Sequence, residues 1–140
     1  MIIDGKKIEI GSVFIADSVY TVQGKKVNTN QITIVSKDKK YEFIFWTLVH
    51  YNDFNSLKLN EKVDITEKVD YYDIDLIVDG TIYLNNIENT HIYFTKLDEN
   101  IFQLNVEIIH PGEQSILKGK KNVNISKFEV ETIIDFTKVV

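Results

Sequence analysis

Cysteine is absent from this sequence of 140 residues. Its absence excludes disulfide bonds, thiolate metal sites and cysteine nucleophiles. The chain is nevertheless long enough to bury about two-thirds of its unfolded surface, so it can fold on an apolar core alone. No proline-rich linker or change of composition divides it, and we therefore expect a single β domain over residues 1–140.

Arginine is also absent, and all 16 basic residues are lysines. Arginine supplies the bidentate hydrogen bonds that proteins use on phosphate and guanine. Because the net charge is also −5, we expect no specific binding to nucleic acid. A single alanine and a single proline, beside abundant isoleucine, lysine and asparagine, are typical of AT-rich coding. This usage indicates a low-GC bacterium or one of its mobile elements, such as a phage.

Long hydrophobic runs are missing too. The N-terminal apolar stretch is interrupted by Asp4 and is too short for a signal peptide. The densest apolar run, residues 43–49, is far shorter than a membrane span. We therefore expect a soluble protein with no membrane span, which stays in the cytoplasm or enters an assembly made there.

The sequence does contain many segments in which every second residue is apolar. Residues 72–78, 101–110 and 127–136 are examples. This period of two, together with β-branched and aromatic residues, indicates strands that turn one face toward a core. Short strands separated by polar turns predict an all-β fold. We expect an antiparallel β-sandwich or partly open barrel of about nine to eleven short strands, with little or no helix.

The longest strand is expected over residues 41–51. One side of it carries Phe43 and Phe45, and the other carries Ile44 and Trp46. Because both sides are largely apolar, the pattern predicts a central strand that is covered on both faces.

The strongest local signal is the dipeptide Asp79-Gly80, which lies between two alternating segments. It predicts a two-residue type I′ hairpin, whose positive φ angles suit these residues. Another turn is expected at Gly24-Lys25-Lys26. The Asp79-Gly80 hairpin sets three cross-strand pairs, namely Val78 with Thr81, Ile77 with Ile82, and Leu76 with Tyr83.

Three aspartates are the first candidate for chemistry. Asp73 and Asp75 are two positions apart on one strand, so their side chains share a face about 7 Å apart, and Asp79 follows. Carboxylates in this arrangement could hold calcium or magnesium, or act as a general acid and base. Their spacing does not fit a calcium-binding EF-hand loop. We favour the simpler interpretation, a solvated strand face followed by an ordinary turn.

The histidines are the second candidate. His50, His91 and His110 are far apart in the sequence, and each lies near the end of a predicted strand. Three strand ends that met at one rim could form a three-histidine zinc site. Unrelated positions are the interpretation that we favour.

Tyrosines are the third candidate, because aromatic strands can line an interaction face or a ligand cavity. They are also what an ordinary β core contains. The tyrosines to test as interaction residues are Tyr41, Tyr51, Tyr71, Tyr72, Tyr83 and Tyr93.

No serine has the context of a hydrolase nucleophile, and the six glycines are too scattered for a phosphate-binding loop. The pattern favours a non-enzymatic interaction or structural module, either an assembly subunit or a protein-binding partner, that associates with itself or with another protein. We expect no cofactor. The first alternative is a β-barrel that binds a small apolar ligand in its interior. The second is a metal-assisted hydrolase that uses the aspartates or histidines.

Overall fold

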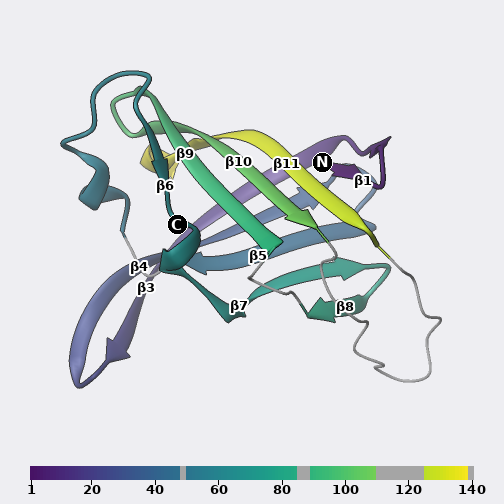
Figure 1. The fold of residues 1–140 in the computed structure, drawn as a ribbon, viewed down its shortest axis with the longest axis horizontal. Helices are drawn as coiled ribbons and strands as arrows, with labels where there is room; N and C mark the ends of the chain where they lie inside the picture. Colours follow the sequence, from purple (N-terminus) through teal and green to yellow (C-terminus); the bar gives the residue numbers. More distant parts are fainter. Residues whose placement is uncertain (48–49, 85–88, 110–124, 139–140) are drawn as a thin grey trace.

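The structure, a computed structural model, describes residues 1–47, 50–84, 89–109 and 125–138, without the side chains at 20, 22, 51, 68–73 and 81–84. Two antiparallel sheets pack together (Figure 1), which confirms the predicted all-β fold and makes it a sandwich. Within the described ranges, no helix is long and apolar enough to cross a membrane. The helical segments are short 3₁₀ turns, including η1 (Tyr51–Phe54), η2 (Thr66–Lys68) and η4 (Phe136–Lys138).

The six-stranded sheet contains β1 (Ile2–Ile3), β2 (Lys6–Lys7), β6 (Lys62–Asp64), β9 (Thr90–Asp98), β10 (Ile101–Ile109) and β11 (Lys127–Asp135). Their order is β2-β1-β11-β10-β9-β6, so the N-terminal hairpin lies beside the last strand. The Asp4 carboxylate ties the two together, because it accepts hydrogen bonds from the backbone N–H groups of Ser126 (2.9 Å) and Lys127 (2.8 Å).

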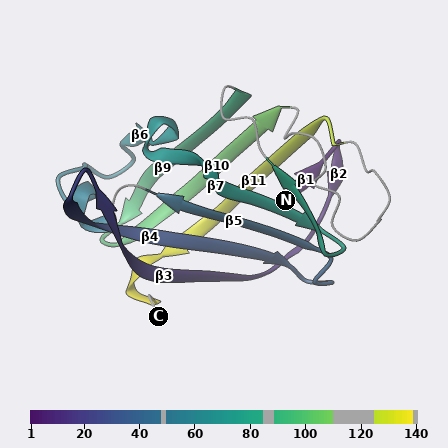
Figure 2. The ribbon, with the colours of Figure 1, turned by 90° about the horizontal axis from the view of Figure 1, so that it is seen from below.

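The five-stranded sheet contains β3 (Ile10–Val22), β4 (Lys25–Ser36), β5 (Tyr41–Thr47), β7 (Val69–Val78) and β8 (Thr81–Leu84). Their order is β3-β4-β5-β7-β8, which makes β3 and β8 the two edges. Figure 2 looks onto the outer side of this sheet, with the strands of the six-stranded sheet crossing obliquely behind it.

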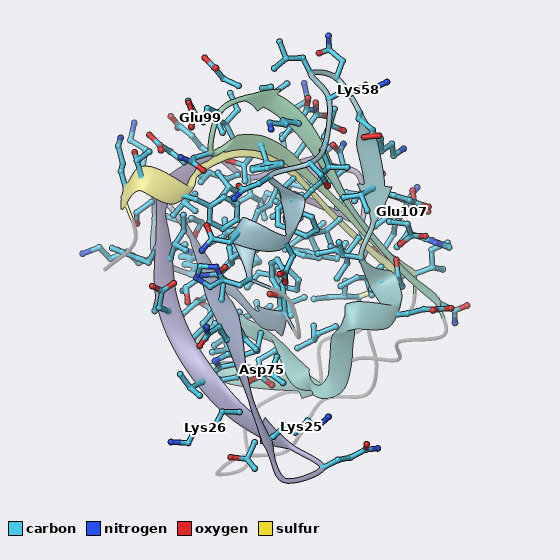
Figure 3. All side chains as sticks on the ribbon, turned by 90° about the vertical axis from the view of Figure 1, so that its left-hand side faces the viewer. Lys25, Lys26, Lys58, Asp75, Glu99 and Glu107 are labelled. Atoms are coloured by element: carbon cyan, nitrogen blue, oxygen red, sulfur yellow. The ribbon has the colours of Figure 1, made fainter. Side chains whose placement is uncertain are left out.

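The hairpin of β3 and β4 is longer than the rest of the sheet. β4 pairs with β3 along its whole length, but it pairs with β5 only over residues 31–35. The end of the hairpin, residues 18–29, therefore projects as a two-stranded arm (Figure 1). Figure 3 shows Lys25 and Lys26 at the end of this arm.

The core is formed by alternate residues of both sheets. Phe43 on β5 contacts Phe45 on the same strand and Phe128 on β11, with ring centroids 5.3 and 5.0 Å apart. A second aromatic group consists of Phe54, Phe94, Phe102 and Phe136, whose neighbouring ring centroids are 5.6 to 5.9 Å apart. Strands of both sheets therefore meet through large rings, and the interior is filled by side chains.

The Asp79-Gly80 turn is confirmed. Both residues have positive φ angles, 49° and 77°, as a type I′ turn requires. The three predicted cross-strand pairs are all present. Gln23-Gly24 has the same geometry, with φ angles of 51° and 77°. The arm therefore turns one residue earlier than predicted, and Lys25 and Lys26 already belong to β4.

β5 is the central strand of its sheet, as predicted, but it ends at Thr47 rather than at residue 51. The polar residues that follow form a capped 3₁₀ turn instead: the His50 ring accepts a hydrogen bond from the backbone of Asn52, and the Asp53 carboxylate accepts one from the backbone of His50. On one face of β5, Phe43, Phe45 and Thr47 are buried. The opposite face, with Ile44 and Trp46, is only half-buried in the described part of the chain.

Candidate interaction surface

The side of the five-stranded sheet that faces away from the core, which we call the outer face, carries several partly exposed apolar side chains. Cross-strand pairing makes this surface continuous. Phe14 pairs with Thr33, which pairs with Ile44 on the central strand. Phe14 is 54% exposed. The outer face consists of Ser12, Phe14, Ala16, Gln31, Thr33, Val35, Glu42, Ile44, Trp46, Asp75 and Ile77.

Among the described side chains of the outer face, charge is sparse and has one sign. Glu42 and Asp75 are the charged residues among those that define it. Partial burial raises the pKa of the Asp75 carboxyl above its usual value. Apolar surface with little charge is typical of the centre of a protein interface. The outer face is therefore suited to contact with another protein that places a positive group near these acids.

Asp75→Asn is expected to raise the free energy of unfolding near pH 7 by up to about 0.5 kcal/mol. Since burial raises the pKa of Asp75 in the folded state, ionisation of this carboxyl costs more there than in the unfolded chain. That cost is present above the raised pKa and disappears as the pH falls below the unfolded value of 3.8. Urea denaturation of both chains near pH 7 and near pH 3 measures the difference. An equal gain at both pH values would contradict burial as the cause.

The outer side of the six-stranded sheet carries more charge, and Ile109 and Ile133 are also exposed there. On the outer side of the six-stranded sheet, the Lys127 ammonium lies 3.7 Å from the Glu107 carboxylate and 3.4 Å from that of Glu129. Gln103 donates a hydrogen bond to the Glu131 carboxylate. Figure 3 shows Glu107 on this side of the molecule. Such a surface is well solvated, so the two sides of the sandwich differ in chemistry.

A surface hollow of about 660 Å³ lies between the N-terminal hairpin and strands β10 and β11. Met1, Ile8 and Val130 contribute apolar atoms to it, and four glutamates surround them, namely Glu9, Glu107, Glu129 and Glu131. The sequence-based alternative of an apolar ligand site required a cavity inside the strands. The hollow is instead outside the core and has a mixed lining.

The three aspartates of the metal hypothesis do not all lie on one strand face. Asp73 and Asp75 are in β7, whereas Asp79 is exposed in the turn that follows. The side chain of Asp73 is outside the described set. Among the described residues, no three histidine or acidic side chains are grouped closely enough to hold a metal ion.

The two described histidines lie in different parts of the fold, His50 at the start of η1 and His91 on β9. The His50 ring contacts β3, with its Nε2 atom 3.1 Å from the Asp17 carboxylate, while its Nδ1 atom accepts the backbone hydrogen bond of η1. Both ring nitrogens of His50 therefore have structural partners, and the ring joins η1 to the base of the arm. His91 is exposed on β9 and stacks on Tyr93, with ring centroids 6.3 Å apart. His110 lies outside the described residues.

The two described tyrosine side chains are not on the outer face. Tyr41 packs against the core. Tyr93 lies on the polar sheet, with the Lys62 ammonium 4.1 Å from its ring centroid. The side chains of Tyr51, Tyr71, Tyr72 and Tyr83 are outside the described set, so their interaction role stays a prediction.

Sequence reasoning missed the outer-face residues, although their signal was present. Ile44 and Trp46 alternate with buried Phe43 and Phe45, which the sequence presents as a strand that is apolar on both sides. We interpreted that pattern as burial on both faces. A strand with one face in the core and an apolar face that binds another protein gives the same pattern.

Comparisons of this chain with family models, with curated proteins and with solved structures found no match. The chemistry of its own surface is therefore the basis on which its function is proposed.

Proposed function

We propose that this chain is a non-enzymatic interaction or structural module, either an assembly subunit or a protein-binding partner, and that the outer face is its contact surface. The observation that carries the proposal is the group of apolar side chains Phe14, Ile44, Trp46 and Ile77, which lie on one face of three strands of the same sheet. A group of partly exposed apolar side chains on one sheet face supports a site for another protein. Because the amino-acid composition is typical of AT-rich coding, we also propose that a phage or another mobile element encodes the chain.

The composition of the outer face supports this function. Phe14 and Trp46 are aromatic side chains of the kind that contribute most to binding energy in protein interfaces. Thr33 and Gln31 add hydrogen-bonding groups that a partner can satisfy. A partner that covered Asp75 would bury its carboxyl further and raise its pKa further, because burial already raises it. A cation on the partner would offset this cost and stabilise the contact.

Ligand binding in the hollow is supported less well. Its volume lies within the usual range for ligand pockets. Four carboxylates line it, however, and an apolar ligand would remove water from them without replacing their hydrogen bonds.

Ile44→Lys is the sharpest test of the proposed contact surface. It places a charge at the centre of the outer face, and we expect it to weaken association at least about tenfold, which corresponds to about 1.4 kcal/mol. Ile133→Lys is the matched control, because Ile133 is 60% exposed on the other sheet. Size-exclusion chromatography with light scattering over a range of concentrations measures the mass of both variants and of the unchanged chain.

The possible results distinguish an assembly subunit from a protein that binds a different partner. Association that Ile44→Lys weakens and Ile133→Lys does not is the expected result. Equal masses for all three chains in an assembled state would contradict self-association through the centre of the outer face. A monomer at every concentration would rule out the assembly subunit and leave only binding to a different protein.

A further inference from the structure

The free edge of β3 is the second unusual feature of the five-stranded sheet. Natural proteins keep edge strands short, charged or covered, because an open edge presents unpaired backbone N–H and C=O groups. Three of the four edges follow this rule: β2 has two residues, β6 has three and β8 has four. β3 has 13 residues and, within the described chain, has β4 as its one neighbour.

The composition of β3 leaves this edge unprotected. The strand contains no lysine and no proline, and its one charged residue is Asp17. The Asp17 carboxylate is held by the Asn30 amide at 2.8 Å and the His50 ring at 3.1 Å, both from the strand's own chain. Both contacts are to its Oδ1 atom, and the Asp17 side chain remains 58% exposed, so it is the single charge of this strand. Phe14 and Val19 are 54% and 58% exposed on the same strand.

We propose that β3 pairs with β3 of a second copy of this chain, antiparallel and about a two-fold axis at Phe14, which joins the two five-stranded sheets into one sheet of ten strands. The inference rests on the proposed function, since it names the partner and the edge through which an assembly subunit would associate. A two-fold contact uses the same strand twice and is the commonest symmetry of protein oligomers.

The sequence of β3 favours Phe14 as the position of the axis. In that register Phe14 lies opposite Phe14, and aromatic cross-strand pairs are favourable. Asp17 then lies opposite Gly11, and the two Asp17 residues are about 20 Å apart along the strands, beyond the screening length. An axis at Asp17 would place like charges opposite each other. The other pairs that the Phe14 axis sets are small or apolar, namely Val13 with Ile15 and Ser12 with Ala16.

This pairing would also extend the outer face. Ser12, Phe14 and Ala16 form its border on β3, so the outer faces of the two copies would meet at the Phe14 pair. The exposed ring of Phe14 would be covered, and a second partner would meet an apolar surface twice as wide.

Engineered cysteines test the register directly, because the chain has none of its own. Opposite residues of antiparallel strands lie within disulfide reach. We therefore mix chains that carry Ser12→Cys with chains that carry Ala16→Cys, keep Phe14 intact, and oxidise them. The expected product is a mixed dimer of twice the 16.3 kDa mass, formed at least tenfold faster than dimers of either variant alone. Ile133→Cys, which is more exposed and lies on the other sheet, controls for random collision.

Phe14→Lys provides a second test that leaves the fold intact, as circular dichroism checks. It is expected to raise the dissociation constant of the dimer at least tenfold. Assembly in light scattering without the Ser12–Ala16 crosslink overturns the β3 edge and leaves the proposed function standing. A monomer at every concentration also overturns the inference and limits the proposed function to a different protein. Assembly that Phe14→Lys does not weaken overturns the axis at Phe14.

Discussion

Phe43→Ala is expected to lower the free energy of unfolding by about 3–5 kcal/mol. Phe43 is completely buried on the central strand, and its ring contacts Phe45 and Phe128. Its removal leaves a cavity where the two sheets meet. Since no disulfide supports the fold, and domains of this size are stable by only about 5–15 kcal/mol, the loss is a large share of the total. Urea denaturation measures it.

Phe14→Ala is the matched control for this truncation, because the same side chain is 54% exposed on the edge of the same sheet. In the monomer it is expected to cost less than about 1 kcal/mol, since little buried area is lost. Equal costs at the two positions would contradict a core centred on Phe43.

Gly11→Ala is expected to cost about 1–3 kcal/mol, as overpacking does in a rigid site. Gly11 lies at the bulge where β3 first pairs with β4. A Cβ atom there would lie 2.8 Å from the Cα of Lys37 and 3.2 Å from the carbonyl oxygen of Ser36, and both of these are backbone atoms. The chain can relieve the contact only if it moves Lys37, whose N–H donates to the Glu9 carbonyl at 2.8 Å.

Substitutions at Gly24 distinguish two reasons why a glycine is required, namely lack of space for a side chain and a positive φ angle. A Cβ atom at Gly24 would meet nothing within 4 Å, but φ there is +77°. Gly24→Asn is therefore expected to be milder than Gly24→Ala, since asparagine tolerates positive φ. At Gly11, asparagine is expected to be at least as harmful as alanine. Denaturation of the four variants checks this, and a rescue of Gly11 by asparagine would contradict the steric explanation.

The fold class was predictable because local patterns determine it. Alternation identified the strands, and Asp79-Gly80 fixed one hairpin and its register. The order of strands was not predictable in this way. The pairing of Ile2 with Glu129 joins opposite ends of the sequence, and no local signal encodes it. The turn at residues 51–54 was missed because it is capped by hydrogen bonds of the His50 and Asp53 side chains, which periodicity does not reveal.

The candidate surface was predictable only in part, for a related reason. Periodicity shows that Ile44 and Trp46 share a face, but not whether another layer covers that face. The exposure of the β3 edge likewise depends on strand order, which is a property of the whole fold. The tyrosines were chosen by residue type, and the two whose side chains are described lie elsewhere.

Hydrogen–deuterium exchange at low and high protein concentration tests the central claim most directly, because it reports where the chain makes contact. The account predicts that concentration slows exchange of the backbone amides along β3 and leaves those of β6, the edge strand of the other sheet, unchanged. Protection confined to the six-stranded sheet, in a chain that assembles, would contradict it.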